Sequence, residues 1–230
     1  MKIRIKFSKQ GQMRFIGHLD IMRFFQKAIR RAGININYSE GFSPHQKMSF
    51  ASPLGVGLIS SGEYFDIESN TSFSSEESLR LLNGAMVEGM EVTSFKKLPD
   101  NAKNCMASIA AADYVLHINN TANPITKEIT DSFLSRDNVV ITKKTKKSER
   151  EINIRPFIYE LSSDEKSVFM KVASGSVNNI KPEIVIDAIC SLYNLDTPKG
   201  IYERVEMYAN TGTEDNINLV TLESLGENIE

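Results

Sequence analysis

The stretch KIRIKFSKQGQMRFIGHLDIMRFFQKAIRRAG, residues 2–33, changes its periodicity along its length. Charged and apolar residues alternate over residues 2–7, which is typical of a β-strand with one buried face. Apolar residues then recur every three or four positions over residues 19–32, which is typical of an amphipathic helix. A strand followed directly by a helix indicates a fold that mixes α and β structure.

The same order of elements continues along the chain and then recurs. The period-2 and helical patterns after residue 33 predict short extended segments at 35–38 and 48–51, strands at 63–68 and 90–96, and a helix opened by a Ser74/Glu77 capping box. In the second half they predict strands at 112–118, 139–143, 151–161, 167–173 and 201–208, with helices at 125–134 and 182–193. This order predicts an α+β fold of two tandem ferredoxin-like βαββαβ units with antiparallel sheets.

Shifts in composition predict where the domains end. We expect a basic N-terminal domain over residues 1–98, a polar linker that contains Pro99, and a second domain over residues 105–210. The last twenty residues, 211–230, hold five acidic residues and no basic one. We therefore expect them to form an acidic, flexible tail.

Composition also limits the class of protein. No apolar run approaches the ~18 residues that a membrane span needs, and the N-terminus alternates charged with apolar residues, so we expect a cytoplasmic protein that does not enter the membrane. Cys105 and Cys190 stand alone in the sequence, without the paired spacing of a zinc or iron–sulfur site. No metal site and no bound cofactor are expected.

Positive charge is concentrated at the N-terminus, although the whole chain has a net charge of −2. Residues 1–50 hold ten Lys and Arg against Asp20 and Glu40, which leaves +8. On the helix at 19–32, helical spacing places the basic residues opposite the apolar face. The predicted anion- or RNA-binding residues are Arg14, Arg23, Lys27, Arg30, Arg31, Ser43 and Lys47. A basic helix face is also common on proteins that bind no anion, so both interpretations stay open.

Two of the three histidines lie beside these cations. His18 and Asp20 stand at the start of the helix, and His45 follows the rigid turn sequence Gly41 to Pro44. His18, Asp20 and His45 are candidates for acid–base chemistry or for lining an anion pocket at the helix N-terminus. The alternatives are a packed histidine at position 18 and an acidic residue at position 20 that simply favours the helix dipole. The nearby aromatics Tyr38, Phe42 and Phe50 could stack on bases or belong to the core.

The motifs in this region resemble a known block of sequence. MRFIGHLD at 13–20, RFFQKAIRRAG at 23–33, GFSPH at 41–45 and EYFDI at 63–67 are similar to the hallmark block of the radical SAM-linked protein family, a bacterial domain family of unknown function. Gly17 replaces the usual serine, and Gln46 replaces the usual proline. The resemblance implies a radical SAM protein as partner, encoded beside this chain or fused to it. This chain lacks the cysteine motif that holds an iron–sulfur cluster, so it is not itself the radical enzyme.

Three functions follow as expectations. The first is a non-catalytic accessory protein that binds RNA or presents a substrate to a radical SAM enzyme, for example in tRNA or rRNA modification. The second is a stand-alone RNA-processing or RNA-modifying enzyme in which His18 and His45 form the acid–base pair. The third is a protein-interaction module whose basic face docks an acidic partner.

Overall fold

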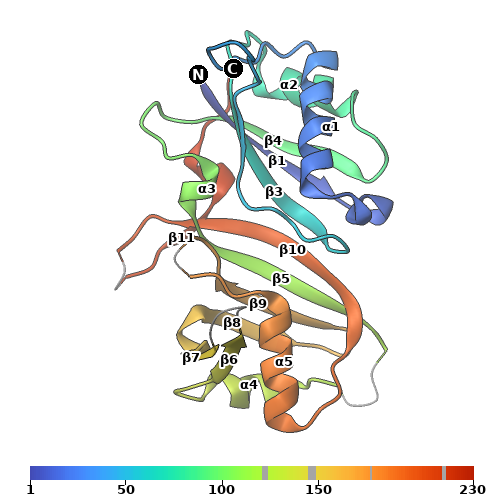
Figure 1. Cartoon of the computed structure of the whole chain (residues 1–230), viewed down its shortest axis with the longest axis vertical. Coiled ribbons are helices and arrows are strands. Elements are labelled where there is room, and N and C mark those ends of the chain that lie inside the picture. Colours follow the sequence, from blue (N-terminus) through green and yellow to red (C-terminus); the bar gives the residue numbers. More distant parts are fainter. Residues whose placement is uncertain (121–123, 145–148, 177, 214–215) are drawn as a thin grey trace. The chain divides into compact units, whose positions relative to one another are not determined.

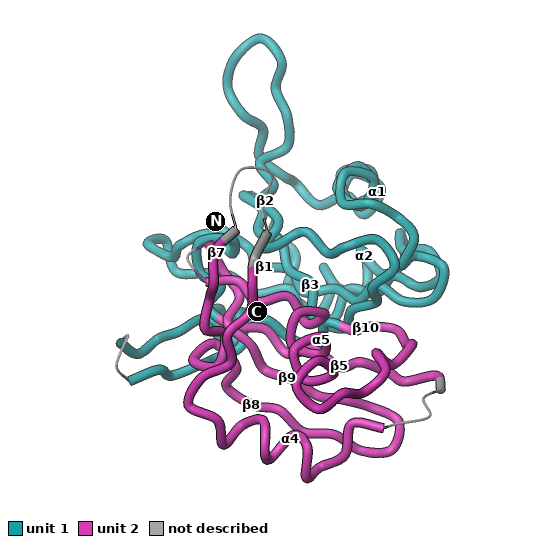
Figure 2. Tube along the Cα trace, turned by 60° about the horizontal axis from the view of Figure 1, so that its bottom comes forward, with its two compact units in different colours: residues 1–110, 204–230 teal, residues 111–203 magenta. Residues whose placement is uncertain are grey.

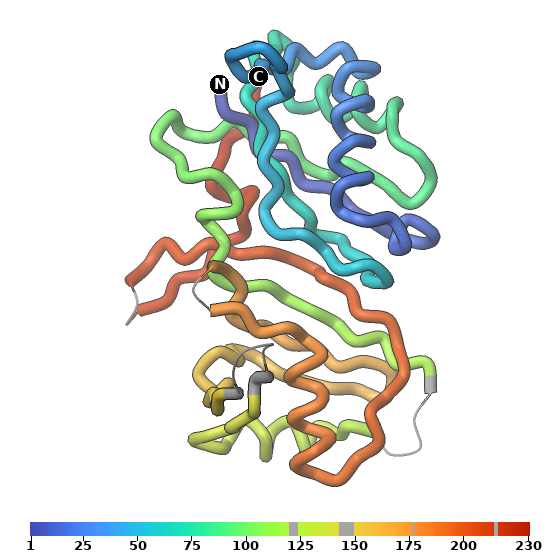
Figure 3. The backbone as a smooth tube through the Cα atoms, in the orientation of Figure 1, coloured from blue at the N-terminus to red at the C-terminus, as the bar shows by residue number. Residues whose placement is uncertain are grey.

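The computed structural model (Figure 1) describes residues 1–120, 124–144, 149–176, 178–213 and 216–230. The chain divides into two compact units, coloured separately in Figure 2. Unit 1 contains residues 1–110 and 204–230, and unit 2 contains residues 111–203. This division differs from the predicted boundaries, because the C-terminal residues join unit 1, in which both chain ends lie (Figure 3).

Unit 1 is a sheet whose two longest helices pack on one face. Its elements are β1 (Lys2–Lys9), η1 (Gly11–Phe15), α1 (His18–Arg31), β2 (Met48–Phe50), β3 (Ile59–Glu68), α2 (Ser75–Asn83), β4 (Met90–Lys97), α3 (Cys105–Ser108), β11 (Leu219–Thr221) and η3 (Leu222–Leu225). The strand order is β4-β1-β3, with β2 and β10 (Lys199–Asn210) also paired to β3. The described pairings of β1 with β3 and β4 are antiparallel.

The alternation in β1 sorts its side chains between the two faces of this sheet. Ile3, Ile5 and Phe7 are buried on one face, in a core that includes Phe25 and Ile29 of α1. The rings of Phe7 and Phe25 meet at 4.6 Å, edge to face. Burial of this stripe turns the charged side of α1 outward. Half of the predicted capping box is present at α2: Ser74 Oγ accepts a hydrogen bond from Glu77 N at 3.2 Å, while the Glu77 carboxylate pairs with Arg80.

Arg4 and Lys6 of β1 point to the opposite face, where Arg4 is buried, Lys6 is half-buried and both are paired. Arg4 forms two hydrogen bonds with Asp66 of β3, at 2.8 and 2.9 Å. Lys6 Nζ contacts Glu206 of β10 at 2.6 Å and Glu223 of η3 at 2.8 Å. The C-terminal segment therefore packs on unit 1, which corrects the prediction of a flexible tail: Leu222 is fully buried, and Lys97 and Glu227 form a β-bridge. An acidic composition was misleading here, because Lys6 supplies the opposite charge.

Unit 2 is built from β5 (Ile109–Asn120), α4 (Lys127–Leu134), β6 (Val140–Lys144), β7 (Glu149–Asn153), η2 (Arg155–Phe157), β8 (Ile158–Ser163), β9 (Ser167–Ala173) and α5 (Pro182–Tyr193), with β10 beside β5. Its strand order is β10-β5-β9-β8. The single strand predicted at 151–161 is interrupted by η2, because Pro156 has no N–H for a strand ladder. As a result, β6 and β7 form a separate two-stranded sheet.

The α+β class is confirmed. Over the described residues the chain has five α-helices, a large sheet of nine mostly antiparallel strands and the two-stranded β6–β7 sheet. The finer prediction of two tandem ferredoxin-like units stays a prediction. No helix in the described part of the chain is long and apolar enough to cross a membrane.

Candidate nucleic-acid interface

The outward face of α1 carries most of the predicted cations. Arg23, Lys27, Arg30 and Arg31 are all exposed. Arg23 Nη1 lies 3.2 Å from Asp20 Oδ1, in a solvent-exposed pair, and Arg31 Nη2 donates to the carbonyl of Ala85 at 3.3 Å. Lys27 and Arg30 have no partner among the described residues. Exposed pairs of this kind are weak, so all four side chains can reorient toward an external anion.

The start of α1 adds one more cation and one exposed aromatic ring. Gly17 is the N-cap and offers no side-chain hydrogen bond, while Asp20 lies in the first turn. The guanidinium of Arg14 stacks over the ring of Phe15, 4.7 Å from its centroid, and this ring is 53% exposed. Arg14 therefore presents its charge next to an apolar surface.

The GFSPH motif forms a protruding loop, which we call the 38–46 loop. Its base is a β-bridge between Tyr38 and Gln46. Inside it, the Nδ1 of His45 is 2.9 Å from Ser39 Oγ, and the backbone N–H of His45 donates to the same oxygen at 3.0 Å. Gly41 has φ +108°, a conformation that side chains disfavour. These contacts leave Phe42 fully exposed, with Ser43 exposed beside it.

A hydrogen bond places the base of this loop beside the α1 cations. The buried side chain of Gln46 donates from Nε2 to the carbonyl of Gln26 at 3.2 Å. On a helix surface the neighbours of position 26 lie three and four residues away, and Arg23 and Arg30 are among them. The 38–46 loop and the cations therefore share one edge of α1. Lys47, just after the loop, pairs with Glu68 at 2.8 Å, which holds the pKa of that carboxyl below its usual value.

The two histidines are not in one cavity. His18 is half-buried against Phe50, with ring centroids 5.2 Å apart, and it lines a cavity of about 10 Å³ with Phe7, Lys9, Ile21, Leu54 and Glu63. The 38–46 loop meets α1 at Gln26, eight residues beyond His18, which is about 12 Å along the helix axis. His45 is bonded within its own loop and does not line that cavity. This arrangement does not favour an acid–base pair made of His18 and His45.

A buried ionic cluster, which sequence reasoning did not single out, lies behind His18. Arg204 of β10 forms two hydrogen bonds with Glu63, at 2.8 and 2.6 Å, and donates to the carbonyl of Ser52. Lys9 is almost fully buried and donates to the carbonyl of Ile16 at 2.9 Å. Burial lowers the pKa of Lys9. The only sequence signal for this cluster was Lys9, a charged residue at an inward-facing position of β1. No sequence pattern singled out Arg204.

Among the residues that the structure describes, both cysteines, Cys105 and Cys190, are free and buried. Within the described residues, no group of three or more His, Cys, Asp or Glu side chains is placed to hold a metal ion. Cys105 is buried, and its thiol donates to the carbonyl of Ser49 at 3.0 Å. Burial raises the pKa of this thiol to about 12, so it is a poor nucleophile.

Comparisons with known proteins identify a family match and a distant structural neighbour. The sequence model of a family described as "Uncharacterized protein conserved in bacteria (DUF2344)" matches residues 2–182. No curated protein matches. Among 27 matching chains of solved structures, one from "Crystal Structure of a Cbf5-Nop10-Gar1 Complex" has 9% sequence identity and a TM-score of 0.49, and the match covers 89% of this chain and 48% of that chain. This chain thus spans about half the length of that neighbour.

Proposed function

We propose, from the premise that this chain belongs to the DUF2344 family of proteins conserved in bacteria, that it is a non-catalytic RNA-binding protein. The proposed interface consists of the α1 cations and the 38–46 loop. Its expected ligand is a single-stranded segment of RNA, which offers both phosphates and unstacked bases.

The observation that carries this proposal is the exposure of Phe42 on a loop whose base contacts α1, the helix that carries cations without a strong partner. An aromatic ring is rarely left fully exposed, because its burial would stabilise the fold by removing apolar surface from water. Bases stack on exposed aromatic rings, and backbone phosphates pair with nearby Lys and Arg side chains. In this proposal Lys27 and Arg30 pair with phosphates, and Phe42 stacks on a base.

An acidic protein partner would use the cations but would not need an exposed ring on a glycine-bearing loop. The interaction-module alternative therefore explains less of this surface. Tyr38, which is 47% exposed at the base of the loop, adds a second aromatic group that an RNA strand can contact.

We extend the proposal to a partner on the strength of the sequence motifs. The resemblance to the radical SAM-linked family supports a radical SAM enzyme to which this chain presents tRNA or rRNA. We also propose that each unit is ferredoxin-like. A ferredoxin-like βαββαβ unit has the strand order 4-1-3-2, with its four strands numbered along the chain. The observed orders β4-β1-β3-β2 and β10-β5-β9-β8 both follow this order, which supports that description.

The test reverses charge on the proposed interface. A variant with Arg23→Glu, Lys27→Glu and Arg30→Glu is expected to lose binding of a fluorescently labelled single-stranded RNA in an anisotropy titration. For the wild type, the logarithm of the affinity should fall with the logarithm of salt concentration, with a slope of roughly −0.7 for each phosphate contact. The variant should lose most of this salt dependence.

The matched control carries the same change in net charge at exposed lysines of unit 2, as Lys127→Glu, Lys166→Glu and Lys199→Glu. It should bind the RNA as the wild type does. If both triple variants weaken binding equally, only the total charge matters and the proposed interface is wrong.

A further inference from the structure

Unit 2 contains an open groove of about 500 Å³ between β6 and α5. Figure 1 shows β6 between β7 and α5. Residues 139–142 line one side, and one face of α5 lines the other through Ile184, Asp187, Ala188, Ser191 and Leu192. The groove is apolar at its borders, where Val140 is 57% exposed and Leu192 is 43% exposed.

The strand that borders this groove has an open edge. Val139 accepts a hydrogen bond from the backbone N–H of Ile154 at 2.8 Å, so its backbone groups face the β7 side. Because these groups alternate along an antiparallel strand, those of Val140 and Thr142 point away from β7. Over the described residues, β6 pairs only with β7. The edge therefore offers unpaired backbone donors and acceptors to another strand.

The dimensions of the groove match a short extended peptide. The stripe of α5 from Ile184 to Leu192 is nine residues long, and its eight steps of 1.5 Å correspond to about 12 Å along the helix. A strand rises about 3.3 Å per residue, so roughly four residues of an extended chain fit alongside. Their side chains would alternate between the apolar border and solvent.

The groove also selects for charge. Asp187 is exposed and lies midway along the α5 stripe. The remaining groove residues of α5 are apolar or hydroxyl-bearing. A Lys or Arg side chain next to apolar ones would pair with this carboxylate.

We propose that this groove binds an extended segment of a partner protein, which adds to β6 as a strand and places a basic side chain at Asp187. The backbone hydrogen bonds to Val140 and Thr142 provide affinity, and the contacts with Leu192 and Asp187 provide specificity. The site lies in unit 2 and does not depend on RNA binding by unit 1.

The test uses the full chain and a displayed library of random linear peptides. Selection on the wild type should enrich alternating apolar residues around a Lys or Arg, while selection on an Asp187→Lys variant should enrich Asp or Glu at that place. For a peptide selected on the wild type, fluorescence polarisation should show that Asp187→Lys weakens binding on the order of tenfold, because an attractive pair becomes repulsive. On binding, the amide protons of Val140 and Thr142 should exchange more slowly by NMR.

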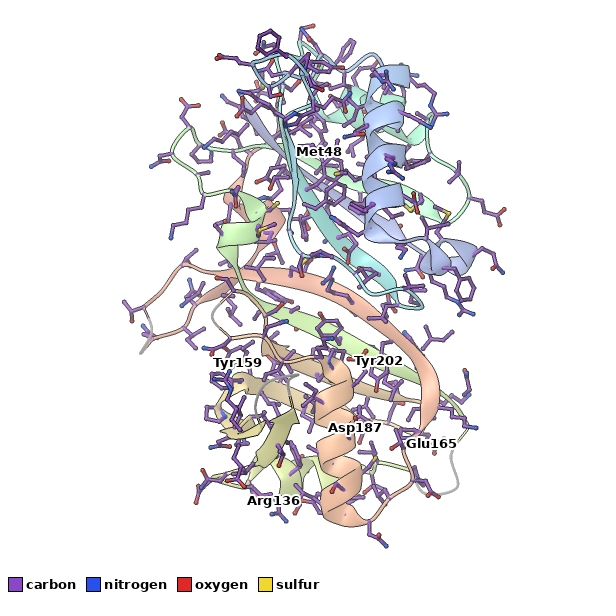
Figure 4. All side chains as sticks on the ribbon, viewed as in Figure 1. Met48, Arg136, Tyr159, Glu165, Asp187 and Tyr202 are labelled. Carbon is purple, nitrogen blue, oxygen red and sulfur yellow. The ribbon has the colours of Figure 1, made fainter. Side chains whose placement is uncertain are left out.

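Glu165→Lys is the control, since it makes the same charge change at an exposed turn of unit 2 outside the groove; Figure 4 labels both residues. It should leave peptide binding unchanged. The proposal is overturned if selection enriches no groove-dependent peptide, if Asp187→Lys does not alter the charge preference, or if protection appears elsewhere. Self-association of the wild type that Asp187→Lys abolishes would assign the groove to a second copy and overturn it as well.

Discussion

Phe42 is the residue on which the proposed interface depends most. The tight contacts between Ser39 and His45 close the 38–46 loop beneath it, and the positive φ of Gly41 turns the chain just before it. The ring itself contacts little of the protein, because its whole surface is exposed. Its removal should therefore change binding without changing the stability of the fold.

We predict that Phe42→Ala weakens binding of single-stranded RNA by about 1–3 kcal/mol, or roughly five- to 150-fold, because one base loses its stacking partner. Phe42→Tyr should bind like the wild type, since it keeps the ring. Both variants should unfold at the wild-type temperature. Equal affinity of the Ala variant and the wild type would remove Phe42 from the interface.

At the scale of elements, β1 connects both faces of unit 1. Its apolar residues pack under α1, and on the other face Arg4 binds β3 while Lys6 binds β10 and η3. The 3₁₀ helix η3 is held there by Glu223, whose carboxylate is 2.8 Å from Lys6 Nζ. Burial alone would raise the pKa of Glu223, but the hydrogen bond from Lys6 and its positive charge outweigh burial and hold this pKa below the usual glutamate value.

This lowered pKa predicts how the stability of unit 1 depends on pH. A carboxyl with a lower pKa in the folded state than in the unfolded state stabilises the fold above its unfolded pKa, about 4.3 for Glu. That stabilisation is lost as the pH falls through the lower, folded pKa. Glu223→Gln should therefore show a shallower loss of unfolding free energy in acid than the wild type, as measured by urea unfolding at a series of pH values.

Glu227→Gln provides the comparison within the same C-terminal segment. The Glu227 side chain is 76% exposed, and its carboxylate lies 3.9 Å from Lys97 Nζ, which is a long separation for an ion pair. Its interaction with Lys97 is therefore weak. Its pH profile should follow the wild type. A profile for Glu223→Gln that matches the wild type in acid would show that the Lys6 pair does not stabilise the fold.

At the scale of the whole molecule, unit 1 is assembled from two separate pieces of the chain. Residues 204–230 return to residues 1–110 and complete its sheet and core. Ser75 illustrates this closure: its hydroxyl accepts a hydrogen bond from Ile229 N at 2.8 Å, and its backbone N–H donates to the carbonyl of Ile229 at 2.9 Å. The stability of unit 1 should therefore depend on residues near the C-terminus.

We predict that Leu222→Ala lowers the free energy of unfolding by about 2–5 kcal/mol, because a fully buried side chain leaves a cavity. Ile217→Ala, in the same segment but 47% exposed, should change it by less than about 0.5 kcal/mol. Chemical denaturation monitored by circular dichroism measures both. A Leu222→Ala variant as stable as the Ile217→Ala variant would mean that the C-terminal segment is not part of the cooperative unit.

Much of this architecture could be predicted because it depends on local periodicity. The apolar stripe of α1, the alternation in β1 and the cap at Ser74 each involve residues close in sequence, and the structure contains all three. The same logic failed at residues 151–161, where Pro156 interrupts an otherwise continuous pattern. The sequence pattern also could not tell which aromatic residues near α1 are buried. In the structure Phe50 is in the core, whereas Phe42 is exposed.

The sequence by itself determined that α1 turns its cations outward, because a helical period sorts apolar and charged residues onto opposite faces whatever lies beyond them. Only the tertiary structure decided that the 38–46 loop joins those cations, that His18 and His45 lie in different surroundings, and that Arg204 pairs with Glu63. These outcomes depend on contacts between residues far apart in the chain. Such contacts depend on how the whole chain folds, and they produce no periodic pattern in the local sequence from which they could be predicted.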